Sequence, residues 1–231
     1  MPFIGHSDDE KKIRCAVITP VGPGHFETFK NFCAPSVELA RMSSTGPFEA
    51  IAHIPVYDLD GKFGRSESRN KGVQLADRGG YEWLFFLDAD DLMFEEAFDA
   101  FSDYVDAYDA VWGQIVETQF DNMNSVKIRS GQVAEINSFK DLLKIDPFYS
   151  LQMGHFVKTE LAIQHPFDVG MNTGEDFNYY LKLWRSNKCK KCQKIFFLNV
   201  RGNHSTGPKS ANGVQWRQFV ERELRDAAAY A

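Results

Sequence analysis

Residues 81–91 read Tyr-Glu-Trp-Leu-Phe-Phe-Leu-Asp-Ala-Asp-Asp, an apolar run that ends in three acids. Residues 81–87 are too apolar to face water, so we expect a strand at the centre of a sheet. In open α/β sheets, ligands bind beyond the carboxyl ends of such strands, where these acids lie. Neighbouring carboxylates repel one another, and a hard cation such as Mg²⁺ or Mn²⁺ relieves the repulsion while leaving sites open for phosphate. The run therefore predicts a site for a divalent metal and a phosphate group.

A helix cap is the plainer explanation of these acids. Asp90 or Asp91 can cap a helix that we predict over residues 94–107, because a carboxylate accepts hydrogen bonds from the free amides of a first helical turn. A cap explains one acid, however, and leaves the others at the end of a buried strand unexplained. An EF-hand calcium loop is excluded, since its glycine and distal glutamate are missing at the required offsets.

Strand-like and helix-like segments alternate through the first half of the chain. The expected strands are 13–19, 48–56, 81–87 and 110–117. The expected helices are 25–42, which Pro35 should kink or break, 66–78 and 94–107. This alternation predicts an α/β fold with a mostly parallel central sheet flanked by helices on both faces.

The second half of the chain is less regular. A hairpin is expected over residues 126–136, and a strand over 195–200. Further helices are expected over 138–144, 174–186 and 213–230. Cys189 and Cys192 form a C-x-x-C among lysines without a second ligand pair at zinc spacing, so we expect a solvated basic loop there. A redox pair is the alternative, because the flanking lysines would lower the pKa of a thiol.

Composition narrows the class of protein. The 231 residues are 43% hydrophobic and carry a formal net charge of −6, which suits one sizeable core and argues against binding nucleic acid. No stretch approaches the roughly 20 apolar residues that a transmembrane helix needs. Residues 1–14 are polar and lack the apolar segment of a signal peptide. We therefore expect a cytoplasmic protein without a transmembrane segment.

Four short motifs lie at the ends of the expected strands and helices. They are Ala16-Val17-Ile18-Thr19-Pro20, Arg69-Asn70-Lys71-Gly72, Phe86-Leu87-Asp88-Ala89-Asp90-Asp91 and Gly174-Glu175-Asp176. In this order they resemble the motifs of the GT-A fold glycosyltransferases, specifically the large inverting family 2. The resemblance covers about residues 13–186 and extends toward His204.

The resemblance implies a single GT-A domain over residues 1–231. Its nucleotide-sugar-binding half would be about 13–117, and its acceptor and catalytic half, with a smaller antiparallel element, about 118–231. Such an enzyme moves a sugar from a nucleoside diphosphate donor to a hydroxyl of a carbohydrate or another acceptor. It would work in the cytoplasm, either free or at the periphery of a membrane or a glycan-assembly complex.

By resemblance, one set of residues binds the donor. The set is Pro20, Val21, Asp58, Arg69, Asp88, Ala89 and Asp90. Asp58 would contact the base or the ribose, although its surroundings depart from the family, which often has an aspartate pair followed by glycine and serine. Arg69 would position the diphosphate or brace the aspartates, and its structural alternative is an ordinary helix-surface arginine.

The resemblance also implies a bound Mn²⁺ or Mg²⁺, which would stabilise the charge of the leaving diphosphate. Asp90 is the expected direct ligand, Asp88 serves the metal or the ribose, and Asp91 is the weakest candidate. His204 resembles the C-terminal histidine that many GT-A enzymes place on the metal, and neutral imidazole is a competent ligand. A solvated loop histidine is the alternative.

Two acids are the expected catalytic residues of the second half. By resemblance, Asp176 is the general base that accepts the proton of the acceptor hydroxyl, which makes the transfer inverting, and Glu175 contacts the acceptor. Spacing alone supports helix capping equally well. Thr173-x-x-Asp176 is similar to a capping box, and both acids suit the N-terminus of a helix.

Three other functions compete with glycosyl transfer. A phosphatase of the haloacid dehalogenase type also places D-x-D after an apolar strand, but it needs Thr or Val where Leu92 stands. A nucleotidyltransferase needs a glycine-rich phosphate loop, whereas Gly22-Pro23-Gly24 is a turn. A non-catalytic sugar-nucleotide-binding protein is the third, and the intact acids argue against it.

Overall fold

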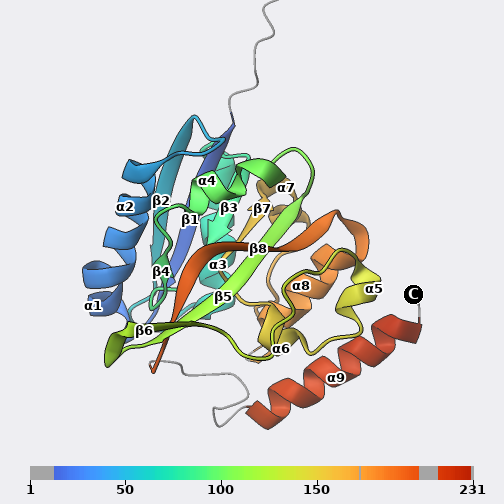
Figure 1. The fold of residues 1–231 in the computed structure, drawn as a ribbon. Coiled ribbons are helices and arrows are strands. Elements are labelled where there is room, and N and C mark those ends of the chain that lie inside the picture. The colour runs from blue at the N-terminus through green and yellow to red at the C-terminus, as the bar shows by residue number, and fades with distance from the viewer. Residues whose placement is uncertain (1–12, 172, 203–212, 230–231) are drawn as a thin grey trace, which may run out of the picture.

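The computed structural model describes residues 13–171, 173–202 and 213–229 (Figure 1). A mixed eight-stranded sheet has the order β2-β1-β3-β7-β5-β8-β4, with β6 paired to β5. The strands are β1 (Arg14–Val21), β2 (Ala50–Tyr57), β3 (Trp83–Phe86), β4 (Leu92–Met93), β5 (Ala110–Gln119), β6 (Asn122–Ile128), β7 (His155–Lys158) and β8 (Cys189–Arg201). The α/β class expected from the sequence is confirmed.

Two groups of parallel strands make up most of the sheet. β1 pairs in parallel with β2 and with β3, and β5 pairs in parallel with β8. Between the groups lies β7, which is antiparallel to both β3 and β5. The antiparallel element expected in the second half of the chain is therefore part of the same sheet.

The strand before the three acids lies at the centre of the sheet, as predicted. β3 has β1 on one side and β7 on the other, and all four of its residues are buried. Because side chains alternate along a strand, Leu84 and Phe86 enter one core cluster while Trp83 and Phe85 enter the other. Burial on both faces accounts for the continuous apolar run.

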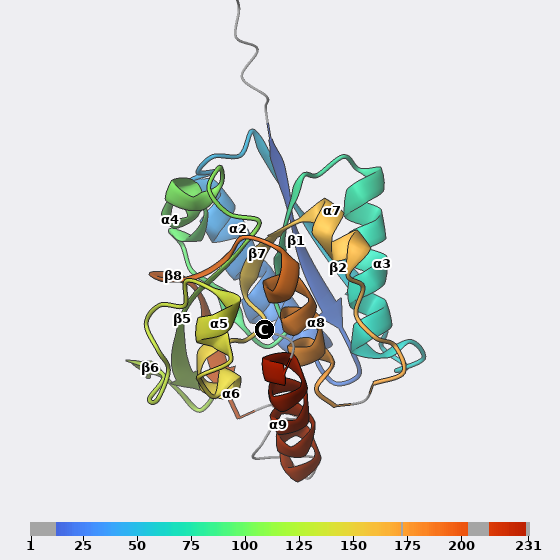
Figure 2. The same ribbon diagram turned by 90° about the vertical axis from the view of Figure 1, so that its right-hand side faces the viewer.

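Helices cover both faces of the sheet (Figures 1 and 2). α2 and α4 pack on the face of Trp83, whereas α3, α7 and α8 pack on the face of Leu84. The helices are α1 (Phe26–Thr28), α2 (Ala34–Ser43), α3 (Gly64–Arg78), α4 (Ala97–Phe101), α5 (Phe139–Leu142), α6 (Pro147–Ser150), α7 (Thr159–Gln164), α8 (Glu175–Ser186) and α9 (Gly213–Ala229). A π-helical turn (Phe29–Cys33) links α1 to α2, and a 3-10 turn (Ser102–Tyr104) follows α4.

Near Pro35, where we expected a kink or a break, the helix changes from π-helical to α-helical geometry. Pro35 lies in the first turn of α2, directly after the π-helical turn, and the helical backbone continues through both. The helix predicted over 94–107 is much shorter than expected, since α4 and its 3-10 turn end at Tyr104.

The hairpin predicted over residues 126–136 is wrong. β6 pairs with the strand before it, so that Ile128 lies opposite Val116 of β5. Ile136 forms only an isolated bridge with Lys191. β5 runs to Gln119, beyond the predicted end at residue 117, and its far end offers β6 a partner.

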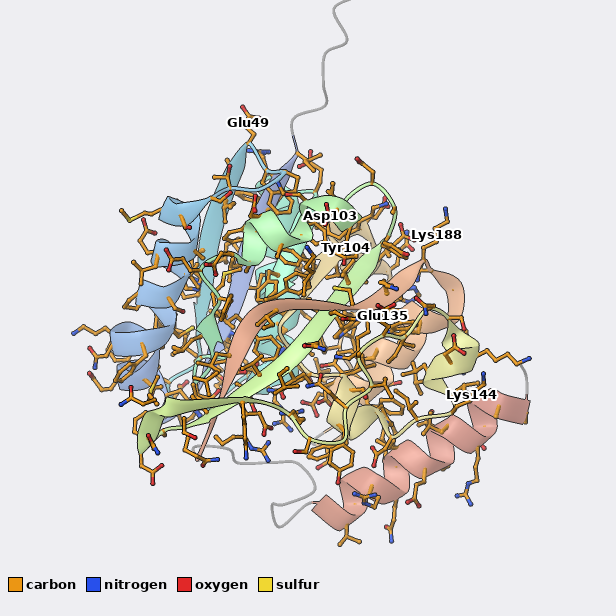
Figure 3. The ribbon with its side chains drawn as sticks, in the orientation of Figure 1. Glu49, Asp103, Tyr104, Glu135, Lys144 and Lys188 are labelled. Atoms are coloured by element: carbon orange, nitrogen blue, oxygen red, sulfur yellow. The ribbon has the colours of Figure 1, made fainter. Side chains whose placement is uncertain are left out.

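The solvated loop expected around Cys189 and Cys192 is also wrong. β8 begins at Cys189, and both thiols are buried beside β5. Burial raises the pKa of each thiol, which makes both inert rather than reactive. Lys191 points inward and donates from Nζ to the Gly113 carbonyl at 2.7 Å. Lys188, directly before the strand, points outward (Figure 3).

Within the described residues, no helix is both long enough and apolar enough to cross a bilayer. α9 instead packs on the domain, because Val220 is buried in the core cluster of α3 and α8 with Phe219 and Leu224 against it.

Candidate active site

The three acids follow the carboxyl end of β3 in a tight turn. Leu87 still bonds to β1 through its amide, which donates to the Ile18 carbonyl at 3.0 Å. The chain then turns, and the Asp91 amide donates to the Asp88 carbonyl at 3.0 Å. Asp88 and Asp90 stay half-buried, whereas Asp91 points into the protein. The turn thus separates the acids into two at the surface and one inside.

Arg69 joins the D-x-D turn to the second acidic motif. It lies on α3, is only 4% exposed, and donates from Nη2 to Asp88 Oδ1 at 2.6 Å. Its Nη1 lies 3.7 Å from Oε1 of Glu175, the first residue of α8. A buried guanidinium between two carboxylates is stable only because they neutralise it. Arg69 therefore braces Asp88, which is close to one of the two tasks expected for it, and it is not a surface arginine.

Arg65 completes this cluster and was not anticipated from the sequence. Its Nε lies 2.5 Å from Oε1 of Glu175, and its Nη2 donates to Oε2 at 3.3 Å. Arg65 and Arg69 stand four residues apart on α3 and therefore share one helix face. That spacing is the signal that could have identified Arg65. Glu175, 3% exposed, turns both oxygens to arginines, which differs from the acceptor contact expected of it.

Asp176 is the more accessible acid of its pair. It is half-buried in the first turn of α8, and its Oδ1 accepts from the Phe177 amide at 2.7 Å. The capping box considered for Thr173 does not form, because the N-cap position belongs to Gly174. Gly174 has φ +79°, and a Cβ there would lie 2.5 Å from Cδ1 of Phe219. Only glycine fits between this turn and α9.

The electrostatics of the turn favour a cation at Asp90. Burial and then the charge of Asp88 raise the pKa of Asp90 to about 6, against the opposing effect of His25 and Arg69. Arg69 bonds Asp88 through one of its two oxygens. Mg²⁺ and Mn²⁺ are commonly held by one or two carboxylates together with phosphates and water. Asp90 and Asp88 fit this pattern.

The third expected metal ligand, His204, lies outside the described residues. Among the residues that the structure does describe, no three His, Cys, Asp or Glu side chains gather closely enough to enclose a metal ion. The acids of the turn thus supply a two-carboxylate set and not a closed cage.

Asp91 is neither a metal ligand candidate nor the cap of the next helix. It is 1% exposed, and its Oδ1 accepts from Asn199 Nδ2 at 2.9 Å and from the Val200 amide at 3.0 Å. α4 begins only at Ala97, too far along the chain for Asp91 to cap it. Burial and the charges of Asp90 and Asp88 raise the pKa of Asp91, while the bonds to β8 lower it.

Asp58 has a structural task that the sequence did not reveal. It is 3% exposed, and its carboxylate accepts from the amides of Phe63 at 3.1 Å and Gly64 at 2.7 Å. It thereby holds the loop that leads into α3, the helix of Arg65 and Arg69. A contact with the base or ribose stays a prediction.

The other expected donor residues lie near the same edge of the sheet. Pro20 and Val21 end β1, with Pro20 half-buried and the side chain of Val21 inside the core. Val21 can therefore meet a ligand only through its backbone, and its carbonyl already accepts from the Asp58 amide at 2.9 Å. Ala89 is buried within the D-x-D turn. His155 is fully buried and stacks on Trp112, with 4.4 Å between the two ring centroids, which makes it a core residue.

A mixed GT-A sheet with a D-x-D turn at the end of its central strand is the framework of a glycosyltransferase. The family model described as "Glycosyl transferase family 2" matches residues 45–200. The chain belongs to this family. A search of curated protein sequences finds no significant match.

Solved structures share the fold at low sequence identity. TarS 1-349 of S. aureus in complex with UDP-GlcNAc superimposes with a TM-score of 0.64 at 13% identity, over 92% of this chain and 65% of that chain. TarS 1-349 without the ligand superimposes with a TM-score of 0.60 at 13% identity, over 81% of this chain and 60% of that chain. S. aureus TarS gives 0.59 at 15%, over 81% of this chain and 37% of that one. The chain thus spans less than two thirds of each TarS chain.

Proposed function

We propose that the protein transfers a sugar from a nucleoside diphosphate sugar to an acceptor hydroxyl with inversion at the anomeric carbon. One observation supports this most: Arg69 contacts both Asp88 of the D-x-D turn and Glu175, whose neighbour is Asp176. Motifs from opposite halves of the chain meet at one arginine, so a donor on the turn and a base on α8 would lie side by side.

The donor side of the proposal rests on Asp90 and Asp88. These two acids would hold a Mn²⁺ or Mg²⁺ ion, which when bound supplies Lewis-acid stabilisation of the leaving diphosphate. Ionised Asp90 has to overcome its own burial and the charge of Asp88, and a divalent cation offsets both. Since TarS 1-349 was solved with UDP-GlcNAc, we propose a uridine diphosphate sugar as the first donor class to test.

The acceptor side of the proposal rests on Asp176. As the acceptor oxygen bonds to the anomeric carbon and the bond to the diphosphate breaks, the Asp176 carboxylate takes the hydroxyl proton. A positioned base of this kind typically contributes about 10²–10⁴-fold in rate. Glu175 would fix the start of α8 through Arg65 and Arg69 and so aim its neighbour. We propose this positioning task for Glu175 in place of acceptor contact.

Thermal denaturation with a panel of nucleotides tests the donor. The panel contains UDP-GlcNAc, UDP-glucose, GDP-mannose, UDP and GDP, each with Mn²⁺, with Mg²⁺ and with EDTA. A ligand at about 100 times its Kd stabilises the folded state by roughly 2.7 kcal/mol. We expect stabilisation by a uridine nucleotide only when a metal is present. Absence of a shift with every nucleotide, or an equal shift in EDTA, would contradict the proposed donor site.

Product analysis separates the proposal from a protein that only binds sugar nucleotides. Incubation with the stabilising donor should release the nucleoside diphosphate slowly to water and faster with a hydroxyl acceptor. Proton NMR of the new glycosidic bond reports the anomeric configuration. Retention of configuration would contradict Asp176 as the base of a single inverting displacement.

A further inference from the structure

A buried arginine behind the D-x-D turn has a hydrogen-bond partner at each of its nitrogens. Arg129 follows β6 and is 7% exposed. Its Nε donates to Glu117 Oε1 at 2.6 Å, and its Nη1 donates to the Phe148 carbonyl at 3.3 Å. Its Nη2 donates to Gln152 Oε1 and, at 3.0 Å, to Asn199 Oδ1. Burying a charge this deeply is stable only when such bonds are made together.

Two side-chain amides connect this arginine to Asp91. Asn199 accepts from Arg129 with its oxygen and donates from Nδ2 to Asp91 Oδ1 at 2.9 Å. Gln152 does the same, accepting from Arg129 and donating from Nε2 to Asp91 Oδ2 at 3.4 Å. Guanidinium, two carboxamides and carboxylate thus close a ring of hydrogen bonds. Neither amide can rotate by 180° without placing its NH₂ against the guanidinium.

The direction of these bonds requires the side chain at position 91 to accept from both amide groups. Arg129 has only donors, so both amide oxygens must face it and both NH₂ groups must face away. The Val200 amide adds a third donor to Asp91 at 3.0 Å. The carboxylate oxygens accept all three bonds, whereas an asparagine at this position would set its NH₂ against the NH₂ of Gln152.

The ring ties together segments that are distant in the sequence. Asp91 ends the turn that carries Asp88 and Asp90, Arg129 follows β6, Gln152 follows α6, and Asn199 lies near the end of β8. We propose that Asp91 and Arg129 are positioning residues that hold the D-x-D turn in the geometry that binds metal and diphosphate. This inference rests on the proposed function and adds to it residues that touch neither ligand.

The test moves the negative charge from position 91 to position 152. In Asp91→Asn, the amide oxygen keeps Asn199 and Val200, but the new NH₂ faces the NH₂ of Gln152. In Gln152→Glu, two carboxylates face each other. In the double variant, Glu at 152 accepts from Arg129 and from Asn at 91, so every bond of the ring is made again at the same net charge.

Two measurements are made on the wild type, the two single variants and the double variant. Urea unfolding without ligand measures how much the ring of hydrogen bonds contributes to stability. Calorimetry of Mn²⁺ binding in the presence of UDP, well below the melting temperature, measures the metal affinity of the D-x-D turn. We expect each single variant to unfold at lower urea and to bind Mn²⁺–UDP about 10–100-fold more weakly, as for other groups that orient metal ligands. The double variant should regain both properties. Asp121→Asn, the same chemical change at an exposed position, should match the wild type in both.

Three other results would overturn the inference, each for a different reason. A double variant that is stable but still binds Mn²⁺–UDP weakly would mean that the charge of Asp91 itself serves the metal. A double variant as unstable as the single variants would mean that the ring does not have the inferred direction. Single variants that behave like the wild type would remove the positioning task. Failure of the wild type itself to bind Mn²⁺–UDP would instead contradict the proposed function.

Discussion

Arg69 Nη2 lies 2.6 Å from Asp88 Oδ1, in a place where the guanidinium is almost fully buried. Arg69 Nη1 also lies 3.7 Å from Glu175 Oε1, so that Arg69 links the D-x-D turn to the start of α8. Burial raises the energetic importance of the link, because a carboxylate left without its cation in such a place is costly.

Arg69→Ala should therefore damage both stability and binding. Removing one partner of a buried ion pair typically costs about 3–5 kcal/mol, and we expect a loss of that size in the free energy of unfolding by urea. The control is Lys71→Ala on the same helix, whose partly exposed pair with Glu67 should be worth about 1 kcal/mol or less. Equal effects of the two variants would contradict the bracing task of Arg69.

Asp90→Asn should raise the stability of the ligand-free protein and abolish its binding of the metal. The pKa of Asp90 is raised to about 6, so its ionised form opposes folding, and ligand-free stability from this group falls as pH rises through about 6. The neutral amide should raise ligand-free stability at pH 7.5 by about 1–2 kcal/mol. It should also abolish Mn²⁺-dependent stabilisation by UDP. Unchanged Mn²⁺ dependence in thermal denaturation would count against Asp90 as a ligand, and Asp106→Asn serves as the exposed control.

Asp176→Asn should stop transfer and leave donor binding intact. Loss of the base should lower the rate of transfer by about 10²–10⁴-fold, because the amide cannot accept the hydroxyl proton. Calorimetry should return the wild-type affinity for the donor with Mn²⁺. Asp226→Asn, at an exposed position of α9, is the matched control for the substitution itself. Substantial transfer by Asp176→Asn would rule out this residue as the base.

Gly174→Ala should destabilise the protein through the turn that carries Glu175 and Asp176. A side chain at φ +79° costs about 1–3 kcal/mol, and its Cβ would collide with Phe219 of α9. We expect a loss of at least this size in urea unfolding, together with slower transfer. Gly22→Ala is the control, because a methyl group there meets open space among the described residues. If both variants unfolded alike, the close contact of α9 with this turn would not hold.

Lys191 should make stability depend on pH between 7 and 9. Burial lowers its pKa from 10.5 to about 7, so the folded state binds fewer protons than the unfolded state above pH 7. Stability from this group therefore rises with pH across that range. The difference in unfolding free energy between wild type and Lys191→Met should grow from pH 7 to pH 9. The same difference for Lys194→Met, an exposed position, should stay constant.

The course of the chain through the first three strands follows from local pattern. β3 is buried on both faces, which requires a continuous apolar run, and that run was readable as a central strand. α3 and α8 were likewise predicted within one or two residues at either end. These elements depend on contacts close in sequence or on burial alone.

The sequence by itself determined the central strand β3, the helices α3 and α8, and the acids that lie where β3 ends and α8 begins. Only the tertiary structure decided which acids are buried and bonded to the protein. The sequence makes Asp91 a candidate metal ligand and Asp58 a candidate base or ribose contact. In the fold, the Asp91 carboxylate accepts from Asn199 and Val200 of β8, and the Asp58 carboxylate accepts from the loop before α3. Arg65 and Arg129 gained their tasks in the same way. A charged side chain is free for chemistry or committed to structure according to what folding places beside it, and residue type and spacing do not carry that information.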